Sequence, residues 1–410
     1  MDKNIWNKIN MINEHIDLTL ENNTNISLFN GISGIPIFYY LNYRLTNNKE
    51  YINKIHFLLD KIIGIINETD IQLSYCNGIL GIAHMFDFIR KKNILKPDAS
   101  IDIEDALSFI DEYIANSILS ITRTIEDIDY LHGSFGAALY LIDRYTNDSK
   151  LEFKNKVIEL FEKLALIILS EIEKTKSVIN NVDLDDDSHK TNCGLAHGHI
   201  SYIIILSKFI DKIPENNLIK STVVECVDCV LGFESNDEND FSKYPSIAVN
   251  KASAHYSVAL GWCYGDQTIS FGLYKASIVL EDEKLKQKAL DLAYRNLERN
   301  TIEKIFPTKK YDASFCHGLS SVAYIHKKWF LISNDKMFYK EYVKYINEVL
   351  NFGNQEIGIA GYQKLLGKGE YADSFGFLDG VIGIGIVLMD YLLEFDDCGW
   401  DNFLLLDVNE

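Results

Sequence analysis

A seven-residue motif centred on glycine occurs seven times in this chain of 410 residues. The central glycines lie between 47 and 67 residues apart, from Gly31 to Gly380. Self-similarity at such a period means that one supersecondary unit is repeated, so the fold should follow from that unit. The copies are LFNGISG (Leu28 to Gly34), YCNGILG (Tyr75 to Gly81), YLHGSFG (Tyr130 to Gly136), LAHGHIS (Leu195 to Ser201), WCYGDQT (Trp262 to Thr268), FCHGLSS (Phe315 to Ser321) and FLDGVIG (Phe377 to Gly383).

Each motif separates two kinds of helical segment. The segment after the glycine is apolar nearly all round, as in YIIILSKFI and IGIVLMDYLL, which is typical of a helix buried on most sides. The segment before the motif has apolar residues three and four apart, as in EYINKIHFLLDKIIGII, which predicts a helix with one wet face. Seven copies therefore predict seven inner and seven outer helices, and patterns typical of strands are scarce.

The fold class predicted from this repeat is all-α, an α/α toroid of seven inner and seven outer helices. An array of helix pairs either stays open as a solenoid or closes on itself. Here the first and last copies keep the full Gly-x-x-Gly and lack the polar face of a capping repeat, which favours closure. Because the repeat runs without a linker from Leu28 to Gly383, we expect residues 1–410 to form a single domain.

Charge and hydropathy exclude several classes of protein. The formal net charge of −19 disfavours nucleic acid, whose phosphates require a basic surface, and suits either a cationic partner or plain solubility. The N-terminal stretch MDKNIWNKINMINEHIDLTL predicts an amphipathic helix rather than a signal segment. Apolar runs such as GVIGIGIVLM fall short of the roughly 20 residues that cross a bilayer. We therefore expect a soluble, cytoplasmic protein without a membrane span.

Copies five and six carry side chains that bind metals. Cys263 and Cys316 occupy the same place, two residues before the glycine, and His317 directly follows Cys316. If successive repeats are neighbours, the two sulfurs approach one another and His317 can supply a third ligand. Zinc prefers thiolates and imidazoles, and a catalytic zinc site keeps one of its four positions open. The pattern predicts one zinc ion per chain.

Other readings of the cysteines remain open at this point. Cysteine is often a small buried apolar residue, and Cys263 and Cys316 fit that description as well. Cys226 and Cys229 form a C-x-x-C, but they lie inside the helical run TVVECVDCVLGF, which predicts two helix residues without a metal. Seven cysteines spread along the chain predict no disulfide framework.

Histidines recur directly before the motif glycine. His197 holds this place in copy four, as His132 does in copy three and His317 in copy six. An imidazole there can transfer protons near neutral pH, while the alternative is a structural histidine bonded to a neighbouring loop. Asp129, just before YLHG, can orient an imidazole or accept a proton. The remaining polar residues at the motifs are interpreted as structural: His199, His255 and Asp379.

These residues resemble the lanthionine synthetase C-like family, the cyclases of lanthipeptide biosynthesis. The resemblance rests on NCGLAHGHIS, GWCYGD and SFCHGLSS together with the sevenfold glycine repeat, and it covers nearly the whole chain. It implies an α/α toroid with one Zn²⁺ held by Cys263, Cys316 and His317, whose fourth position receives a cysteine thiol of the substrate peptide. Binding to zinc lowers the pKa of a thiol and yields a thiolate at neutral pH.

The reaction that the resemblance implies is an intramolecular Michael-type addition. The thiolate adds to the β-carbon of a dehydroalanine or dehydrobutyrine in a ribosomal precursor peptide and closes a lanthionine or methyllanthionine thioether ring. By resemblance, His197 is the general acid/base, Asp129 assists it, and Tyr264 supports the substrate or the metal. The implied partners are the dehydrated precursor peptide, a dehydratase and an exporter of the same antibiotic pathway, and any link to a membrane would run through that complex.

One residue departs from the family pattern. Members with cyclase character commonly carry an arginine four residues before the first zinc cysteine, where this chain has Ala259. This departure bears on how the enolate is stabilised.

Rival functions share parts of this pattern. Addition of glutathione to dehydrated residues would use the same zinc and thiolate chemistry, and a scaffold that only binds peptides or a dehydratase would need no zinc. A glycosidase on an α/α barrel needs paired acids, for which Asp129 with Asp379 is a poor substitute. A prenyltransferase needs a basic cluster for a diphosphate, and the motifs contain none. The sequence therefore favours the zinc-dependent cyclase.

Overall fold

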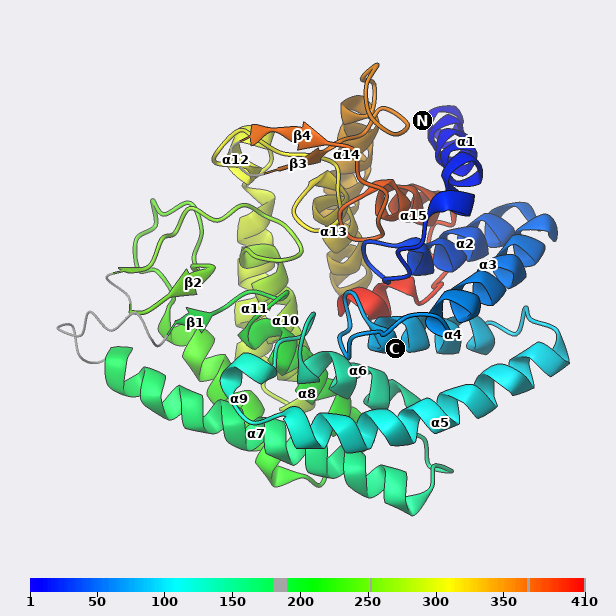
Figure 1. Cartoon of the computed structure of the whole chain (residues 1–410). Coiled ribbons are helices and arrows are strands. Elements are labelled where there is room, and N and C mark those ends of the chain that lie inside the picture. Colours follow the sequence, from blue (N-terminus) through cyan, green and yellow to red (C-terminus); the bar gives the residue numbers. More distant parts are fainter. Residues whose placement is uncertain (180–189, 251–252, 367–368, 409–410) are drawn as a thin grey trace. The chain divides into compact units, whose positions relative to one another are not determined.

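The computed structural model describes residues 1–179, 190–250, 253–366 and 369–408. Within these residues the chain forms fifteen α-helices and only four strands, each of two residues (Figure 1). Two compact units make up the chain. The first unit comprises Met1–Asp111 with Lys310–Glu410, and the second unit comprises Glu112–Lys309. The single domain over residues 1–410 stays a prediction.

An inner helix follows the glycine of every motif, as the repeat predicts. In six copies the glycine is the N-cap residue, and in the first copy a 3₁₀ turn, η2 (Ile32–Gly34), comes between. These helices are buried along most of their length; in the second of them every residue from Leu80 to Ile89 is buried. They are α2 (Ile35–Thr46), α4 (Ile79–Lys91), α6 (Ser134–Arg144), α8 (His199–Lys212), α10 (Asp266–Val279), α13 (Leu319–Ser333) and α15 (Val381–Leu392).

An outer helix precedes every motif. In α3 (Glu50–Ile66) the buried residues are Ile55, Leu58, Leu59 and Ile62, which lie three and four apart and so form one face. The other face meets water, as the amphipathic pattern predicts. The remaining outer helices are α1 (Asp2–Thr19), α5 (Pro97–Ile121), α7 (Leu151–Ile179), α9 (Asn217–Gly232), α11 (Glu283–Leu297) and α14 (Lys336–Phe352). One short helix, α12 (Ile302–Ile305), lies outside this scheme.

The first unit brings the two ends of the repeat together. Inner helix α2 packs against α4 and against α15, and α15 packs in turn against α13. Copies one and seven are therefore neighbours, which is what closure of the array requires. A hairpin of β3 (Lys364–Leu365) and β4 (Tyr371–Ala372) precedes the seventh motif, with Lys364 opposite Ala372.

The second unit contains copies three to five. Inner helix α8 packs between α6 and α10, while α7 covers α6 and α9 from outside. Strands β1 (Thr191–Asn192) and β2 (Ile247–Ala248) pair antiparallel and tie the segment before the fourth motif to the segment before the fifth. The predicted order of outer helix, motif and inner helix is thus kept throughout the unit.

The motif glycines are required by a close backbone approach. In each copy the carbonyl of the residue six positions before the glycine points at its Cα. A Cβ added at Gly78 would lie 2.0 Å from the oxygen of Gln72, and one added at Gly198 would lie 2.1 Å from the oxygen of Asn192. Real Cβ atoms do not approach an oxygen so closely, so any larger residue would force the loop open. At position 265 glycine is required for a second reason as well, since the φ of 111° there is unfavourable for any residue with a Cβ.

The motif loops are joined to one another by backbone hydrogen bonds in one register. We number positions back from the glycine, so that Phe29 and Cys76 both stand at position −2. The carbonyl at position −2 of one copy accepts from the N–H at position −2 of its neighbour in four described pairs. The bonds are Phe29 to Cys76 (3.4 Å), Leu378 to Phe29 (3.1 Å), Cys316 to Leu378 (3.0 Å) and Ala196 to Cys263 (3.3 Å). Equivalent residues of adjacent loops therefore lie side by side.

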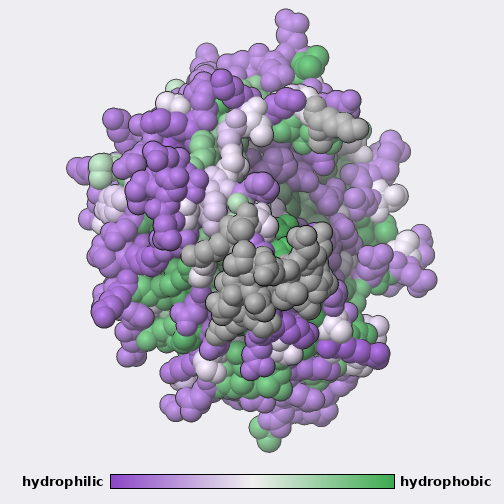
Figure 2. Space-filling model, turned by 90° about the vertical axis from the view of Figure 1, so that its left-hand side faces the viewer, coloured by the Kyte–Doolittle hydropathy of each residue, from purple (hydrophilic) through white to green (hydrophobic). Residues whose placement is uncertain are grey.

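Most of the face in Figure 2 is hydrophilic, with hydrophobic residues in small separate areas. Among the described residues, none of the helices is both long enough and apolar enough to cross a membrane.

We predict that Gly78→Ala lowers the free energy of unfolding by about 1–3 kcal/mol, because its Cβ would collide with the Gln72 carbonyl. The matched control is Gly64→Ala near the end of α3, where an added Cβ meets no atom within 4 Å. This control should gain up to about 1 kcal/mol, because alanine favours a helix over glycine. Urea denaturation of both variants measures the difference. Equal effects of the two substitutions would contradict the close-approach argument.

Candidate metal and acid–base site

The candidate residues occupy positions −2 and −1 of the motif loops, at the entrance of the inner helices. Cys263 and Tyr264 precede α10, and Cys316 and His317 precede α13. Because the glycine that follows is the N-cap of the inner helix, extended at Gly318 and with a φ of 111° at Gly265, these residues stand just before the helix begins. His197 stands in the same way before α8.

His197 and Asp129 form a hydrogen-bonded pair in the second unit. Nδ1 of His197 lies 2.7 Å from Oδ2 of Asp129, and the two side chains are 36% and 21% exposed. The second carboxylate oxygen of Asp129 accepts from the backbone N–H of His132 at 2.7 Å, which fixes the carboxylate in place. The structure therefore brings two of the predicted site residues together, on the third and fourth motif loops.

The pair changes the acid–base properties of the imidazole. The hydrogen bond to Asp129 raises the pKa of His197 above its ordinary value, partial burial opposes this, and electrostatic interactions with Asp129 and Cys263 raise it further. A carboxylate that accepts from Nδ1–H also fixes the tautomer, so that Nε2 is the atom presented to a substrate. His132 stacks on His197 with ring centroids 6.0 Å apart.

The fourth and fifth loops are held together around Tyr264. Its hydroxyl lies 3.4 Å from Nδ2 of Asn192. The Tyr264 ring packs so closely on Gly194 that a Cβ there would lie 2.3 Å from it. The carbonyl of Cys263 accepts from Leu195 and Ala196. Tyr264 and Cys263 are thus placed beside the loop that carries His197.

In the first unit, His317 is supported by a buried carboxylate. Nε2 of His317 lies 3.4 Å from Oδ2 of Asp312, which is fully buried. The same oxygen accepts from the N–H of Leu365 at 2.7 Å, and Oδ1 accepts from Ser314. Burial disfavours the charge of Asp312, but the hydrogen bonds and charge of His317, together with these donors, outweigh it and lower the pKa of the carboxyl.

Sequence reasoning missed Asp312, although a signal was present. Asp312 stands six residues before Gly318, the place that Asn192 and Asp127 hold in their copies. At this position a side-chain oxygen caps the turn two residues later, as Asn192 does for the N–H of Gly194 at 2.9 Å. Because one oxygen of Asp312 serves the turn, the other is available to His317 and to the β3–β4 hairpin.

The residues interpreted as structural differ in their surroundings. His199 is buried in α8, with Nδ1 3.1 Å from the carbonyl of Asn192, and burial lowers its pKa. Asp379 lies 3.5 Å from Nζ of Lys364, and His255 is exposed. Cys226 and Cys229 are both buried in α9, in agreement with a helical C-x-x-C.

Ala259, at the departure from the family pattern, contributes its carbonyl to the close contact with Gly265. A guanidinium reaches the neighbouring backbone from another segment: Arg299 donates to the carbonyl of Val258 at 2.8 Å. A cation is therefore present beside this turn even though position 259 carries none.

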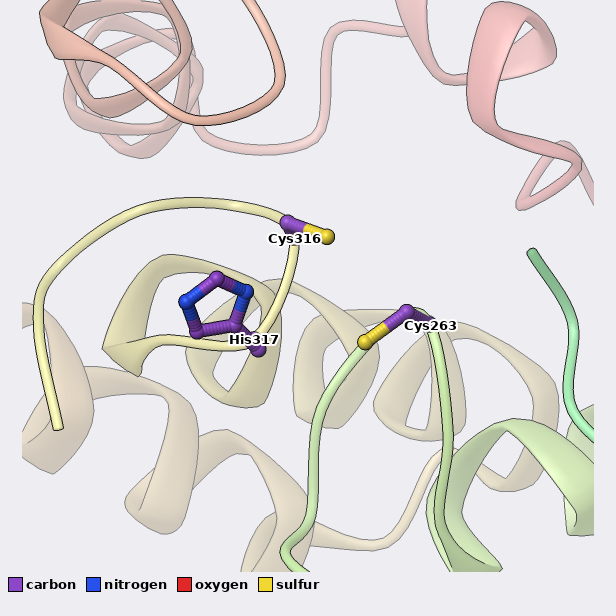
Figure 3. Close-up of side chains that lie close together, drawn as sticks. All are labelled: Cys263, Cys316 and His317. Atoms are coloured by element: carbon purple, nitrogen blue, oxygen red, sulfur yellow. The ribbon is translucent and has the colours of Figure 1, made fainter. Parts of the chain in front are cut away.

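The thiols of Cys263 and Cys316 are both half-buried, and the His317 imidazole is 39% exposed. Figure 3 draws these three side chains, with Cys316 and His317 on the loop before α13 and Cys263 on the loop before α10. The two loops belong to different units of the chain. Together the residues offer two sulfurs and one imidazole nitrogen, a donor set suited to zinc.

Comparison with known proteins identifies the family. The family described as lanthionine synthetase C-like protein matches residues 22–405. The chain belongs to this family. No curated protein matches the sequence.

A solved structure has the same fold. The structure titled nisin cyclase superposes with a TM-score of 0.72 at 21% sequence identity, and the match covers 98% of this chain and 97% of that one. This match confirms the predicted fold class, the all-α α/α toroid.

We predict that Asp129→Asn lowers the pKa of His197, because the substitution removes the charge that favours the imidazolium. His197 should then lose its proton at a lower pH than in the unchanged protein. NMR titration of the His197 ring measures this shift. The control is Asp127→Asn, whose carboxylate accepts from the backbone of Arg123 and Thr124 instead. An unchanged His197 titration in Asp129→Asn would show that the pair has no electrostatic effect.

Proposed function

We propose that this protein is a zinc-dependent peptide cyclase that forms lanthionine or methyllanthionine rings in a dehydrated ribosomal precursor peptide. The observation that carries the proposal is the shared register of the motif loops. In four described pairs of adjacent loops the residues at position −2 are joined backbone to backbone. Cys263 and Cys316 hold position −2 in consecutive copies, so adjacent loops in this register would place their thiols together.

One zinc ion would be held by Cys263, Cys316 and His317. The donor set fits the metal, because two thiolates and an imidazole leave one of four positions for a substrate. Asp312 supports this assignment from within the first unit, since a carboxylate on the second ring nitrogen is a common partner of a metal-bound histidine. With Nε2 directed to Asp312, Nδ1 is the nitrogen that would bind the metal.

Zinc in this site would lower the pKa of a substrate cysteine, so that the thiolate forms at neutral pH. The sulfur adds to the β-carbon of the dehydrated residue, a carbon–sulfur bond forms, and the electron pair of the double bond moves toward the carbonyl. His197 then gives the proton on Nε2 to the α-carbon of the resulting enolate. Asp129 keeps the imidazole protonated and oriented until that step.

Tyr264 would act on the substrate or on the ligand set from position −1 of the fifth copy. Its ring is immobilised by Gly194, so its hydroxyl has a fixed place beside Asn192. Tyr264 is the described polar group of the second unit that we assign to the surroundings of the enolate.

The pathway partners follow from the chemistry. Dehydroalanine and dehydrobutyrine arise by loss of water from serine and threonine, so a dehydratase must act on the same peptide first. An exporter would remove the product. We propose a cytoplasmic enzyme that meets these partners in a biosynthetic complex of an antibiotic pathway.

Two other functions use the same scaffold. Glutathione could replace the internal cysteine as the thiol that adds to the dehydrated residue, with the same ligands and the same acid. A scaffold that binds peptides or a dehydratase would need neither zinc nor His197. The first differs from the cyclase in the thiol that is consumed, and the second in having no reaction.

We predict about one zinc per chain in the purified protein and its loss in Cys316→Ala and Cys263→Ala, because two remaining ligands bind the metal too weakly. The matched control is Cys76→Ala, which also removes a thiol at position −2. It does so in the second copy, which supplies none of the three proposed zinc ligands. Metal analysis by mass spectrometry checks this. Zinc that stays bound in both ligand variants would rule out the site.

We further predict that His197→Ala keeps its zinc and lowers the rate of ring closure by about 100-fold or more, the usual range for a general acid. The assay follows a synthetic peptide with one dehydroalanine and one cysteine by alkylation of residual thiol. Addition of glutathione separates the rivals, since its adduct is heavier than the ring. If no thiol is consumed under either condition, the enzymatic proposals fail and the scaffold remains.

A further inference from the structure

Two adjoining pockets lie along α7 in the second unit. The inner pocket, of about 270 Å³, is lined by His197, His199 and Tyr202 and by the apolar side chains of Ile125, Ile168 and Ile172, among others. The outer pocket, of about 440 Å³, lies against Arg123, Lys163 and Leu166. Both are lined by Ile125, Glu126 and Glu171, so they form one continuous depression, which we call the α7 groove.

The inner end of the groove suits an apolar side chain. Ile168 and Ile172 are buried in α7, while Ile125 in η3 (Ile125–Asp127) is half-buried and forms part of the opposite wall. Pockets that bind ligands are mostly apolar with a few polar groups that fix orientation. Here the polar groups include His197, so whatever occupies this end touches the proposed acid.

Two buried polar atoms at the inner end have no hydrogen-bond partner among the described residues. They are Nε2 of His199, whose residue is 8% exposed, and Oγ1 of Thr191, whose residue is 2% exposed. Both residues line the pocket. Buried polar atoms are nearly always paired, so unpaired ones beside a pocket indicate that a ligand supplies the partner.

His199 can only accept a hydrogen bond at this atom. Its Nδ1–H donates to the carbonyl of Asn192, and burial keeps the ring neutral by lowering its pKa. Nε2 then carries a lone pair. A peptide N–H is the donor that an extended chain would offer at this depth, because every residue except proline has one.

We propose that the α7 groove binds the segment of the precursor peptide that flanks the reacting residues, with a large apolar side chain beside His197 and a peptide N–H on His199. The occupant is the substrate because the groove ends at the imidazole that would protonate it. This inference rests on the proposed function for the identity of the peptide. It adds a site that selects which residue stands next to the ring.

The test fills the groove without touching the catalytic pair. Ile125→Trp narrows the inner pocket, and the matched control Ile121→Trp adds the same bulk at an exposed residue outside both pockets. The probes are synthetic peptides with one dehydroalanine, one cysteine, and either leucine or alanine beside the cysteine or beside the dehydroalanine. Circular dichroism establishes that both variants are folded.

We expect Ile125→Trp to raise KM for the leucine peptides about tenfold or more while kcat changes little. The leucine side chain binds the groove equally well before and during the reaction, so losing this contact weakens substrate binding without raising the barrier from the bound state. The preference of Ile125→Trp should shift from leucine to alanine at the position that occupies the groove. Ile121→Trp should behave as the unchanged protein. Equal KM values and equal preferences in the two variants would overturn the proposal while leaving the cyclase intact.

A second measurement separates this inference from the proposed function. The same peptides with alkylated cysteine cannot form a ring, and their binding is followed by fluorescence anisotropy. Weaker binding to Ile125→Trp than to Ile121→Trp supports the groove even if the protein closes no ring. Indistinguishable binding of the blocked leucine peptides to both variants refutes it.

Discussion

The contact between each motif glycine and the carbonyl six residues before it is the constraint on which the rest of the structure depends. At Gly198 this contact folds the loop tightly onto Asn192 and sets the first residue of α8. Because the same turn is made in every copy, the inner helices of six copies begin directly after the glycine, and that of the first begins one 3₁₀ turn later. The backbone bonds between adjacent loops depend on this equivalence, since they join residues of the same position.

Within each short motif, the backbone holds the loops together while the side chains are available for chemistry. At position −2 the backbone joins adjacent loops, while the side chain is left to vary: Phe29, Leu378 and Cys316 all make the same kind of bond. At position −1 the side chains meet those of the neighbouring loop, as His132 and His197 do. The side chain at position −2 can therefore change without disturbing the backbone bond between loops, and positions −2 and −1 together hold most of the candidate site residues.

Most of the fold could be predicted from the sequence because the repeat is strict. The glycines mark the start of every inner helix, and apolar periodicity separates inner from outer helices. The pairing of Asp129 with His197 was expected from the family resemblance, while the loops alone indicated only that Asp129 can orient an imidazole. Asp312 could not, because its role depends on a hairpin, Lys364–Ala372, that brings Leu365 to the same carboxylate from far along the chain. The α7 groove was also beyond sequence reasoning, since it is formed by side chains of η3 and α7 that share no pattern.

The backbone nature of the bonds between loops has a consequence for how a scaffold of this kind can diverge. Every residue except proline brings both a carbonyl and an N–H to position −2, so no selection for folding acts on the thiol of Cys263 or Cys316 through these bonds. A descendant chain could exchange both cysteines for phenylalanine or leucine, as at Phe29 and Leu378, and keep its architecture. In such a lineage the fold could be kept while the chemistry is lost. Only the side chains at positions −2 and −1 would then show whether a given chain still has the metal and acid–base residues.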